Sequence, residues 1–270
     1  MTNVGQKRTF GWGCCPRREG RFSAVGYRLW PGLGILEVVR IVARVRSSTM
    51  PEVMDWDAAY RNEIFAGPPP WNIGDAQPEI VTLIEAGKLG SPVLDVGCGV
   101  GDNSLELAAR GYDVVGIDLS QTAIATAKKD AEQRGLDSVT FLQGDVTKLD
   151  HDGTFNSVLD CTLFHSLPLE ARDEYLRVIH RAAAPNASLQ MLVFTTDALP
   201  ADSPFPVPNL VTKDELQQAV SAHWDIDSID PAFVYVRLPD VPNLPAHSFE
   251  VDQRGRVKLP AFLLSAHKGS

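Results

Sequence analysis

The feature that most constrains the fold is a short apolar run that ends in a cluster of glycines. Residues 93–96 (V-L-D-V) are typical of a buried parallel strand. The run passes directly into G-C-G-V-G at 97–101, and apolar residues then recur at helical spacing up to Arg110. Glycines let the backbone pass close beneath a ligand, and a helix N-terminus offers unpaired N–H groups. The segment therefore predicts a strand, a ligand-binding turn and a helix, which open an α/β fold.

A second strand with an acidic end follows at once. Residues 113–117 (D-V-V-G-I) predict the strand, and Asp118 stands at its carboxyl end, 19 residues after Gly99. This is close to the offset of about 20 residues at which an acid binds the ribose of a nucleotide cofactor. Ser120 then predicts the cap of the next helix. We expect the Asp118 carboxylate to accept hydrogen bonds from both ribose hydroxyls.

The identity of residue 102 separates two kinds of cofactor. A dinucleotide fingerprint would need glycine there, whereas this chain has Asp102, whose charge would lie near a pyrophosphate. S-adenosylmethionine (SAM) has no phosphate, and its ammonium and sulfonium favour nearby carboxylates such as Asp95. The turn therefore favours SAM. An NAD-dependent oxidoreductase and a SAM-binding protein without catalysis are the alternatives.

At these positions the sequence resembles class I SAM-dependent methyltransferases, over about residues 55–267. Residues 93–101 resemble that family's first motif, and Asp118 matches the acid of its second. Residues 144–146 (G-D-V) match the third, in which Asp145 would meet the adenine amino group. A fourth strand over 155–160 would bring Asp160 beside the methionyl moiety. The resemblance implies a Rossmann-like fold, with a mostly parallel seven-stranded sheet and helices on both faces.

The order of the remaining segments agrees with that fold. We expect helices over 169–183 and 213–222, a strand over 188–195, and a closing antiparallel pair over 232–238 and 258–267. The resemblance also implies a set of cofactor contacts. These are Tyr60, Trp71, Asp95, Gly97, Cys98, Gly99, Asp118, Leu119, Gly144, Asp145, Val146, Asp160 and Cys161.

Aromatic residues gather before the first motif. Residues 56–60 (W-D-A-A-Y) and 70–74 (P-W-N-I-G) are similar to the lid of thiopurine- and thiol-type small-molecule methyltransferases. That lid, at about 54–78, would place Tyr60 and Trp71 on the cofactor; a plain hydrophobic seam is the alternative. The body as a whole resembles the mycobacterial heterocyclic toxin methyltransferases. This implies methyl transfer to a hydroxyl, ring nitrogen or thiol of a small aromatic heterocycle such as a hydroxyquinolone.

Few polar residues are candidates for chemistry on the acceptor. His165 follows the fourth strand and is the candidate general base, or else a polar wall residue that orients the acceptor. Phe164 would face the acceptor ring. Cys98 and Cys161 are expected to be small packing residues near the cofactor. Proline-rich stretches at 199–208 and 239–245 are expected to be loops on the substrate side, which suits an apolar aromatic substrate.

Composition excludes several other classes. The four cysteines form no C-x-x-C spacing and the six histidines no H-x-x-x-H pair, so we expect no metal site and a reducing, cytoplasmic setting. No window reaches the roughly 18 apolar residues of a membrane span. After the fourth strand the chain reads D-C-T-L, where nucleic-acid amino-methylases place N-P-P-Y or D-P-P-Y. The composition leaves the oligomeric state open.

Charge divides the chain near residue 50. Residues 1–49 hold nine Lys or Arg and two Glu, which gives them a net charge of +7. Because the whole chain has a net charge of −9, residues 50–270 must have a net charge of −16. A body this acidic would repel a phosphate backbone, and we therefore expect no nucleic-acid partner. We interpret 1–49 as a basic extension, disordered or encoded upstream of a start at Met50 or Met54, and 50–270 as the methyltransferase domain. A targeting or membrane-surface helix is the alternative for the extension.

Overall fold

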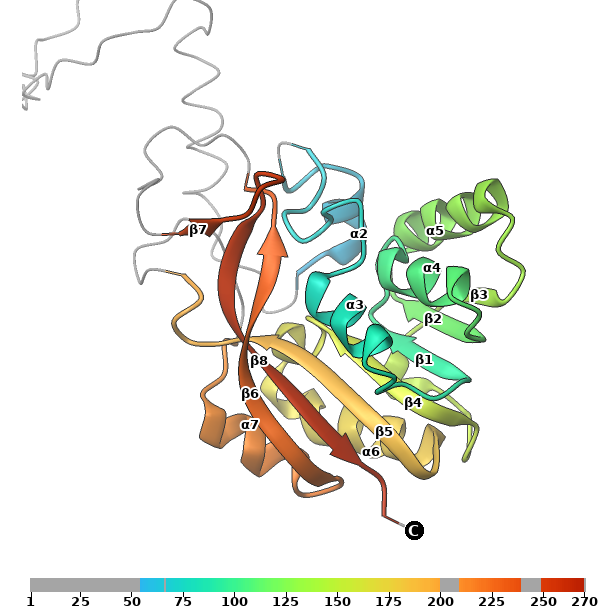
Figure 1. Cartoon of the computed structure of the whole chain (residues 1–270), viewed down its shortest axis with the longest axis vertical. Coiled ribbons are helices and arrows are strands. Elements are labelled where there is room, and N and C mark those ends of the chain that lie inside the picture. The colour runs from blue at the N-terminus through green and yellow to red at the C-terminus, as the bar shows by residue number, and fades with distance from the viewer. Residues whose placement is uncertain (1–53, 66, 200–208, 239–248, 270) are drawn as a thin grey trace, which may run out of the picture. The chain divides into compact units, whose positions relative to one another are not determined.

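The computed structural model describes residues 54–65, 67–199, 209–238 and 249–269. The predicted basic extension over 1–49 and most of the two proline-rich stretches lie outside these ranges. One mixed sheet organises the described part, in the order β3-β2-β1-β4-β5-β8-β6, with β7 paired to β8 (Figure 1). The predicted α/β fold with a Rossmann-like, mostly parallel sheet is confirmed.

Five parallel strands form the larger part of the sheet. They are β1 (Val93–Val96), β2 (Val114–Asp118), β3 (Val139–Gln143), β4 (Phe155–Cys161) and β5 (Ala183–Phe194). All four residues of β1 are buried, as a strand covered on both faces requires. β5 begins five residues before the expected strand.

The antiparallel end differs in detail from the expectation. β6 (Asp225–Val236) and β8 (Val257–His267) are the predicted closing pair, and β6 begins seven residues earlier than predicted. The sheet has eight strands instead of seven, because Glu250–Val251 forms a short β7 that pairs with Val257 and Lys258 of β8. A tight turn at Gly255, where φ is +74°, lets the chain fold back over so short a distance.

Helices cover both faces of the sheet (Figure 1). On one face lie α3 (Pro78–Glu85), α4 (Asp102–Ala109) and α5 (Gln121–Arg134), and on the other α6 (Arg172–Ala182) and α7 (Lys213–Val220). Alternation along β1 decides which side chains meet which layer: Leu94 and Val96 pack in the core that holds α6, while Val93 packs in the core that holds α3. Helix α7 begins with a capping box between Thr212 and Glu215.

Short segments complete the architecture. They are α2 (Trp56–Tyr60) and the 3-10 turns η1 (Val146–Lys148), η2 (Phe164–Ser166) and η3 (Leu169–Ala171). The predicted helix over 169–183 is thus divided into η3 and α6. Strand β1 lies between β2 and β4. The chain therefore continues from β1 to β2 and β3 on one side, and then crosses back to add β4 on the other side of β1. Such a switch in strand order opens a crevice at the carboxyl ends of the strands.

Candidate functional site

A pocket lies at that switch point, between the carboxyl ends of β1, β2 and β4 and the segment 54–77. Its lining has four aspartates and, among the described residues, no lysine or arginine. The lining residues are Met54, Trp56, Tyr60, Trp71, Asn72, Asp75, Gln77, Gly97, Cys98, Gly99, Val100, Asp102, Asn103, Ile117, Asp118, Leu119, Gly144, Asp145, Val146, Cys161, Thr162, Leu163, His165, Ser166, Leu167 and Phe194. A pocket with this balance of charge suits a cation far better than a phosphate.

The glycine turn forms one wall of the pocket. The backbone N–H groups of Gly97 and Cys98 both donate to the carbonyl of Ile117, at 2.8 and 3.1 Å, which ties the turn to β2. Gly101 has φ of +83°, and a Cβ there would lie 2.6 Å from the ring of Phe141. The turn therefore requires glycine for close packing as well as for its backbone conformation.

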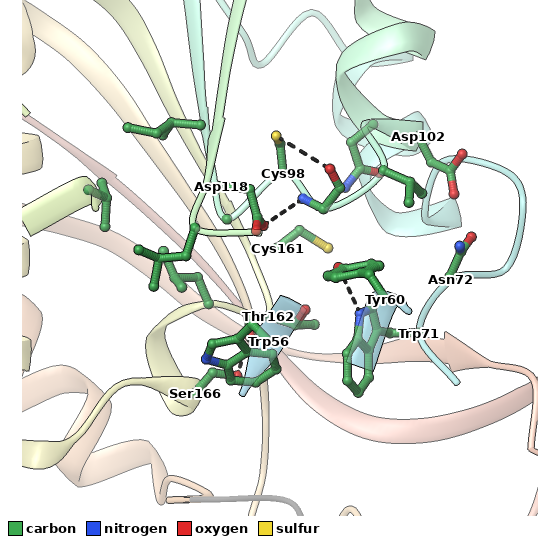
Figure 2. A pocket seen from close by; sticks show the side chains of 18 of the residues that line it. Trp56, Tyr60, Trp71, Asn72, Cys98, Asp102, Asp118, Cys161, Thr162 and Ser166 are labelled. Atoms are coloured by element: carbon green, nitrogen blue, oxygen red, sulfur yellow. Dashed lines mark hydrogen bonds between the residues drawn. The ribbon is translucent and has the colours of Figure 1, made fainter. Parts of the chain in front are cut away.

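Asp118 lies beside this turn, as predicted. Its Oδ2 accepts from the Gly99 N–H at 2.9 Å (Figure 2), and its Oδ1 accepts from the Ser120 N–H at 2.8 Å. Each carboxylate oxygen has a second lone pair, so two hydroxyl donors can still be bound. Burial raises the pKa of Asp118 above its ordinary value, although the two N–H donors oppose this. The orientation of the carboxylate is therefore set by the backbone before any ligand arrives.

Aromatic side chains of the segment 54–77 cover the pocket. The indole Nε1 of Trp71 donates to the Tyr60 hydroxyl at 3.2 Å, and Trp56 packs edge-on against Trp71 with ring centroids 6.0 Å apart. In Figure 2, Tyr60 and Trp71 lie together on one side of the pocket, joined by their hydrogen bond. This arrangement has the form of the predicted lid.

Polar contacts near both ends of this segment fasten it to the body. Asp57 Oδ1 accepts from the Ser120 hydroxyl at 2.7 Å and from the Thr122 N–H at 2.9 Å, at the start of α5. These bonds hold the pKa of Asp57 at about 2, well below its ordinary value. At the other end, the Gln77 side chain forms two bonds with the backbone of Tyr235 in β6, at 2.9 and 2.8 Å. The sequence shows no signal for either contact.

Asp95 lies buried in β1 and does not line the pocket. Its Oδ2 accepts from the Ser104 hydroxyl at 2.6 Å, whereas its buried Oδ1 has no partner among the described residues. Burial raises the pKa of Asp95 to about 7. Its charge acts on Cys98 and Cys161, which do line the pocket. An incompletely satisfied carboxylate close to the pocket floor fits a cationic ligand above it.

A third side of the pocket follows β3. Asp145 Oδ1 accepts from the N–H and hydroxyl of Thr147, at 3.0 and 2.7 Å, and its Oδ2 faces the Lys148 ammonium at 3.0 Å. Burial opposes ionisation here, but these partners outweigh it and lower the pKa of Asp145. Leu119 is 51% exposed at the pocket, an unusual exposure for leucine that leaves it free to cover a flat ring.

Asp160 and Phe164 do not lie where they were expected, because both are turned into the core. Asp160 accepts from the Tyr175 hydroxyl at 2.5 Å and from the N–H groups of Leu163 and Phe164, at 2.9 and 3.3 Å. These bonds fix the turn after β4. The Phe164 ring is fully buried, with the Arg172 guanidinium 4.5 Å from its centroid. Neither residue lines the pocket.

Another wall of the pocket, beside the carboxyl ends of β4 and β5, combines three apolar and three polar side chains. Leu163, Leu167 and Phe194 line it beside Thr162, His165 and Ser166. Thr162 has φ of +73°, which is rare for a β-branched residue and typical of functional sites. His165 is 3% exposed, and its Nδ1 accepts from the Phe194 N–H at 3.4 Å.

The two cysteines of the pocket are free thiols. Burial raises the pKa of both Cys98 and Cys161 far above the ordinary thiol value. A cysteine nucleophile must be a thiolate, and neither residue is one in this environment. Their small volume and their place at the pocket agree with the predicted packing role.

Most of the predicted site residues thus meet in one pocket, and three do not. The twelve that line it are Tyr60, Trp71, Gly97, Cys98, Gly99, Asp118, Leu119, Gly144, Asp145, Val146, Cys161 and His165; Asp95, Asp160 and Phe164 do not. Among the lining residues that sequence reasoning did not single out are Asn103, Ser166, Leu167 and Phe194. Residues 166 and 167 were accessible to it, since they follow His165 in the loop after the fourth strand.

Comparison with known proteins agrees with this geometry. The methyltransferase domain family matches residues 93–186, which run from β1 into β5. A curated relative, the 2-heptyl-1-hydroxyquinolin-4(1H)-one methyltransferase of Mycobacteroides abscessus, is 42% identical over 220 residues. That alignment covers 79% of this chain and 96% of the relative, so it spans far more than the cofactor-binding motifs.

Solved structures show the same fold. One concerns the conversion of a disulfide bond into a thioacetal group during echinomycin biosynthesis; it is 30% identical, has a TM-score of 0.69, and covers 79% of this chain and 91% of its own. Another is the 1,6-didemethyltoxoflavin-N1-methyltransferase of Burkholderia thailandensis with bound 1,6-didemethyltoxoflavin and S-adenosylhomocysteine. It is 21% identical, with a TM-score of 0.56, and covers 90% of this chain and 94% of its own.

Proposed function

Because this chain belongs to the SAM-dependent methyltransferases, we propose that its acceptor is a hydroxyl, ring nitrogen or thiol on a small aromatic heterocycle such as a hydroxyquinolone. The observation that carries this proposal is the pocket itself. The acidic wall built on the glycine turn and Asp118 adjoins an apolar wall formed by Leu163, Leu167 and Phe194, with the Leu163 side chain in contact with the turn at Gly97. The hydroxyquinolone methyltransferase relative supports the choice of acceptor class.

SAM, when bound, supplies a methyl group on a sulfonium whose departing thioether is neutral. We assign its ribose to Asp118, whose two oxygens keep free lone pairs while backbone N–H groups hold the carboxylate in place. Leu119 and Asp145 would contact the adenine. Tyr60 and Trp71 would cover the cofactor, with the charge of Asp95 favouring its cationic amino-acid end.

The residues present suit this cofactor better than a dinucleotide. Asp102, the first residue of α4, occupies the position where a dinucleotide site requires a third glycine, and burial raises its pKa above the ordinary value. A carboxylate there, with three further aspartates on the pocket wall, would repel a diphosphate. The same charges attract a sulfonium.

The acceptor would lie beyond the methyl group, against the apolar wall of the pocket. Displacement at a methyl carbon needs the nucleophile in line with the departing sulfur, and good alignment can supply about 7–11 kcal/mol of the barrier. Trp56 and Phe194 offer flat apolar surfaces for an aromatic ring, while Thr162 and His165 offer polar contacts to one edge. The lid over both ligands would exclude water.

We extend the proposal to the cellular compartment, the cytoplasm, and to the absence of a nucleic-acid substrate. Every described helix is too short or too polar to cross a bilayer. The acidic body disfavours nucleic acid as substrate, and the free Cys98 and Cys161 suit a reducing cytoplasm.

The full chain, incubated with SAM and a panel of hydroxyquinolones, phenols and thiols, tests the proposal. Mass spectrometry should find a product one methyl group heavier with at least one hydroxylated heterocycle, together with S-adenosylhomocysteine. Asp118→Ala is the matched control, since it should lose the product through loss of the cofactor. Tight binding of S-adenosylhomocysteine with no transfer to any acceptor would contradict the proposed acceptor class.

A further inference from the structure

We propose that His165 holds the acceptor by donating a hydrogen bond from Nε2 to its nucleophilic oxygen, and that it does not act as a general base. This inference rests on the proposed function. It follows from the contacts of the imidazole with β5 and from its place in the lining of the pocket.

The hydrogen bond from β5 decides which ring nitrogen carries the proton. The backbone N–H of Phe194 points at His165 Nδ1, over 3.4 Å. An N–H can only donate, so Nδ1 must be the unprotonated acceptor, and a neutral imidazole then has its hydrogen on Nε2. A general base needs the opposite tautomer, with a bare nitrogen turned to the substrate.

The opposite tautomer is disfavoured by burial. Phe194 lies in β5, and its ring packs against the imidazole with centroids 4.9 Å apart. A proton on Nδ1 would face the Phe194 N–H and leave that buried donor without a partner. Leaving a buried donor unsatisfied costs about 1–3 kcal/mol. The tautomer that donates toward the pocket is therefore the stable one.

Protonation of the ring is disfavoured as well. Burial, together with the positive charge of Arg172 on α6, lowers the pKa of His165 to about 3. Asp160 on β4 directs its carboxylate to Tyr175 and to two backbone N–H groups, and Phe194 on β5 does not titrate. At neutral pH the imidazole is thus a neutral donor, and so weak a base would remove a proton inefficiently.

The neighbouring hydroxyl does not compete for the donor role. Ser166 Oγ donates to the carbonyl of Thr162 at 2.9 Å, while the Thr162 N–H donates to the Leu192 carbonyl at 2.8 Å. These bonds hold the backbone of Thr162 at its unusual positive φ. The Ser166 proton is committed to that turn, so of the two neighbours His165 and Ser166 only the imidazole can donate to the acceptor oxygen.

A donor in place of a base determines the form in which the acceptor reacts. The acceptor would lose its proton to solvent before the transfer and bind as an oxyanion. Its oxygen lone pair then forms the bond to the methyl carbon, the carbon–sulfur bond breaks, and that electron pair stays on sulfur as a neutral thioether. No proton moves in the step itself. Acidic N-hydroxy and enolic heterocycles are therefore the preferred class, and aliphatic alcohols the disfavoured one.

Nitrogen-15 NMR of the full chain tests the tautomer without turnover. The imidazole signals of His165, assigned by their absence in His165→Gln, should show a protonated Nε2 and a bare Nδ1. This state should persist between about pH 5 and 8, where an ordinary histidine changes charge. A bare Nε2, or titration within that range, would overturn the proposal.

Two variants separate a donor from a base. The amide of His165→Gln can donate but cannot act as a base, whereas His165→Leu can do neither. We expect kcat/KM to fall by about 10- to 100-fold in the leucine variant, through weaker binding of the anion, since a hydrogen bond to a charged group contributes about 1.5–3 kcal/mol, and by less than tenfold with glutamine. Equal losses in the two, with S-adenosylhomocysteine binding intact, would favour the base.

The ionisation of the bound acceptor gives a readout that does not depend on turnover. With S-adenosylhomocysteine present, the ultraviolet spectrum of a bound hydroxyquinolone should be that of its anion, and His165→Leu should weaken binding of the anion more than of a non-ionisable analogue. Binding of the neutral form would overturn the inference. Methylation of some acceptor would, in that case, leave the proposed function standing.

Discussion

A Cβ atom placed on Gly99 would lie 2.4 Å from the hydroxyl oxygen of Tyr60. The cofactor turn and the lid are therefore in such close contact that only glycine leaves room for the tyrosine. The Tyr60 hydroxyl in turn accepts from the Trp71 indole at 3.2 Å. Any side chain at 99 must displace the lid, and this links a residue of the first motif to a segment about forty residues earlier.

Gly99→Ala should weaken binding of S-adenosylhomocysteine by at least about tenfold, since about 1–3 kcal/mol is the usual cost of overpacking. Gly135→Ala is a matched control, because Gly135 also has positive φ, +65° against +56°, with nothing within 4 Å of its Cβ. It should lower stability but not affinity. Adding Tyr60→Phe to Gly99→Ala should restore part of the affinity, because the next atom of the ring is 3.3 Å away. Equal affinity losses in the two alanine variants, measured by calorimetry, would show that backbone strain alone is responsible.

Asp118→Ala should reduce SAM affinity by about 10- to 100-fold, because charge-assisted hydrogen bonds contribute about 1.5–3 kcal/mol. Asp113→Ala serves as the control, since Asp113 lies just before the other end of the same strand, is exposed, and does not line the pocket. It should bind normally. Unchanged affinity in Asp118→Ala would place the ribose elsewhere.

SAM binding should release a proton near neutral pH, through Asp95. Burial raises the pKa of this carboxyl to about 7 in the free protein, and a bound cation favours its ionised form. Calorimetry at about pH 6 in buffers of different ionisation enthalpy measures the released proton. Asp95→Asn has no such proton to lose and should abolish the Asp95 part of the release. The pKa of Asp95 is about 7 in the folded protein and about 4 in the unfolded chain. The ligand-free protein should therefore also lose stability as the pH rises from about 4 through about 7.

Asp57→Ala should destabilise the protein at neutral pH by about 1 kcal/mol, the usual contribution of a helix-capping acceptor. The pKa of Asp57 is lowered to about 2 in the folded state. Its ionised form therefore makes its full contribution to the free energy of unfolding above the unfolded-state pKa of about 4. It is lost as the pH falls through about 2. Asp57→Asn keeps an acceptor for Ser120 and Thr122 and should retain most of the stability. The unfolding free energies of the unsubstituted protein and of Asp57→Asn should therefore converge in acid; a gap between these two that persists there would show that ionisation of Asp57 is not the cause.

The sequence alone determined most of the elements and the common place of the glycine turn and Asp118. Apolar runs, glycines that need positive φ, and the acid after the second strand are local signals. The carboxyl ends of adjacent parallel strands must meet at one edge of the sheet. That rule brought Gly99 and Asp118 together from spacing alone, and the structure joins them by a bond of 2.9 Å. The local signals were less exact at the antiparallel end, where the two-residue β7 shows almost no periodicity.

Only the tertiary structure decided which lone pairs and protons remain free. Asp160 was expected at the cofactor, but Tyr175, 15 residues away, binds its carboxylate inside the core. Asp57 meets Ser120 across 63 residues, Gln77 meets Tyr235 across 158, and Phe194 sets the tautomer of His165 across 29. The residue type determines which hydrogen bonds a side chain can donate or accept. Which of these bonds it forms depends on the partners that the packing of distant segments brings within about 3 Å. For this reason the cofactor could be inferred from the motifs, whereas the role of His165 could not.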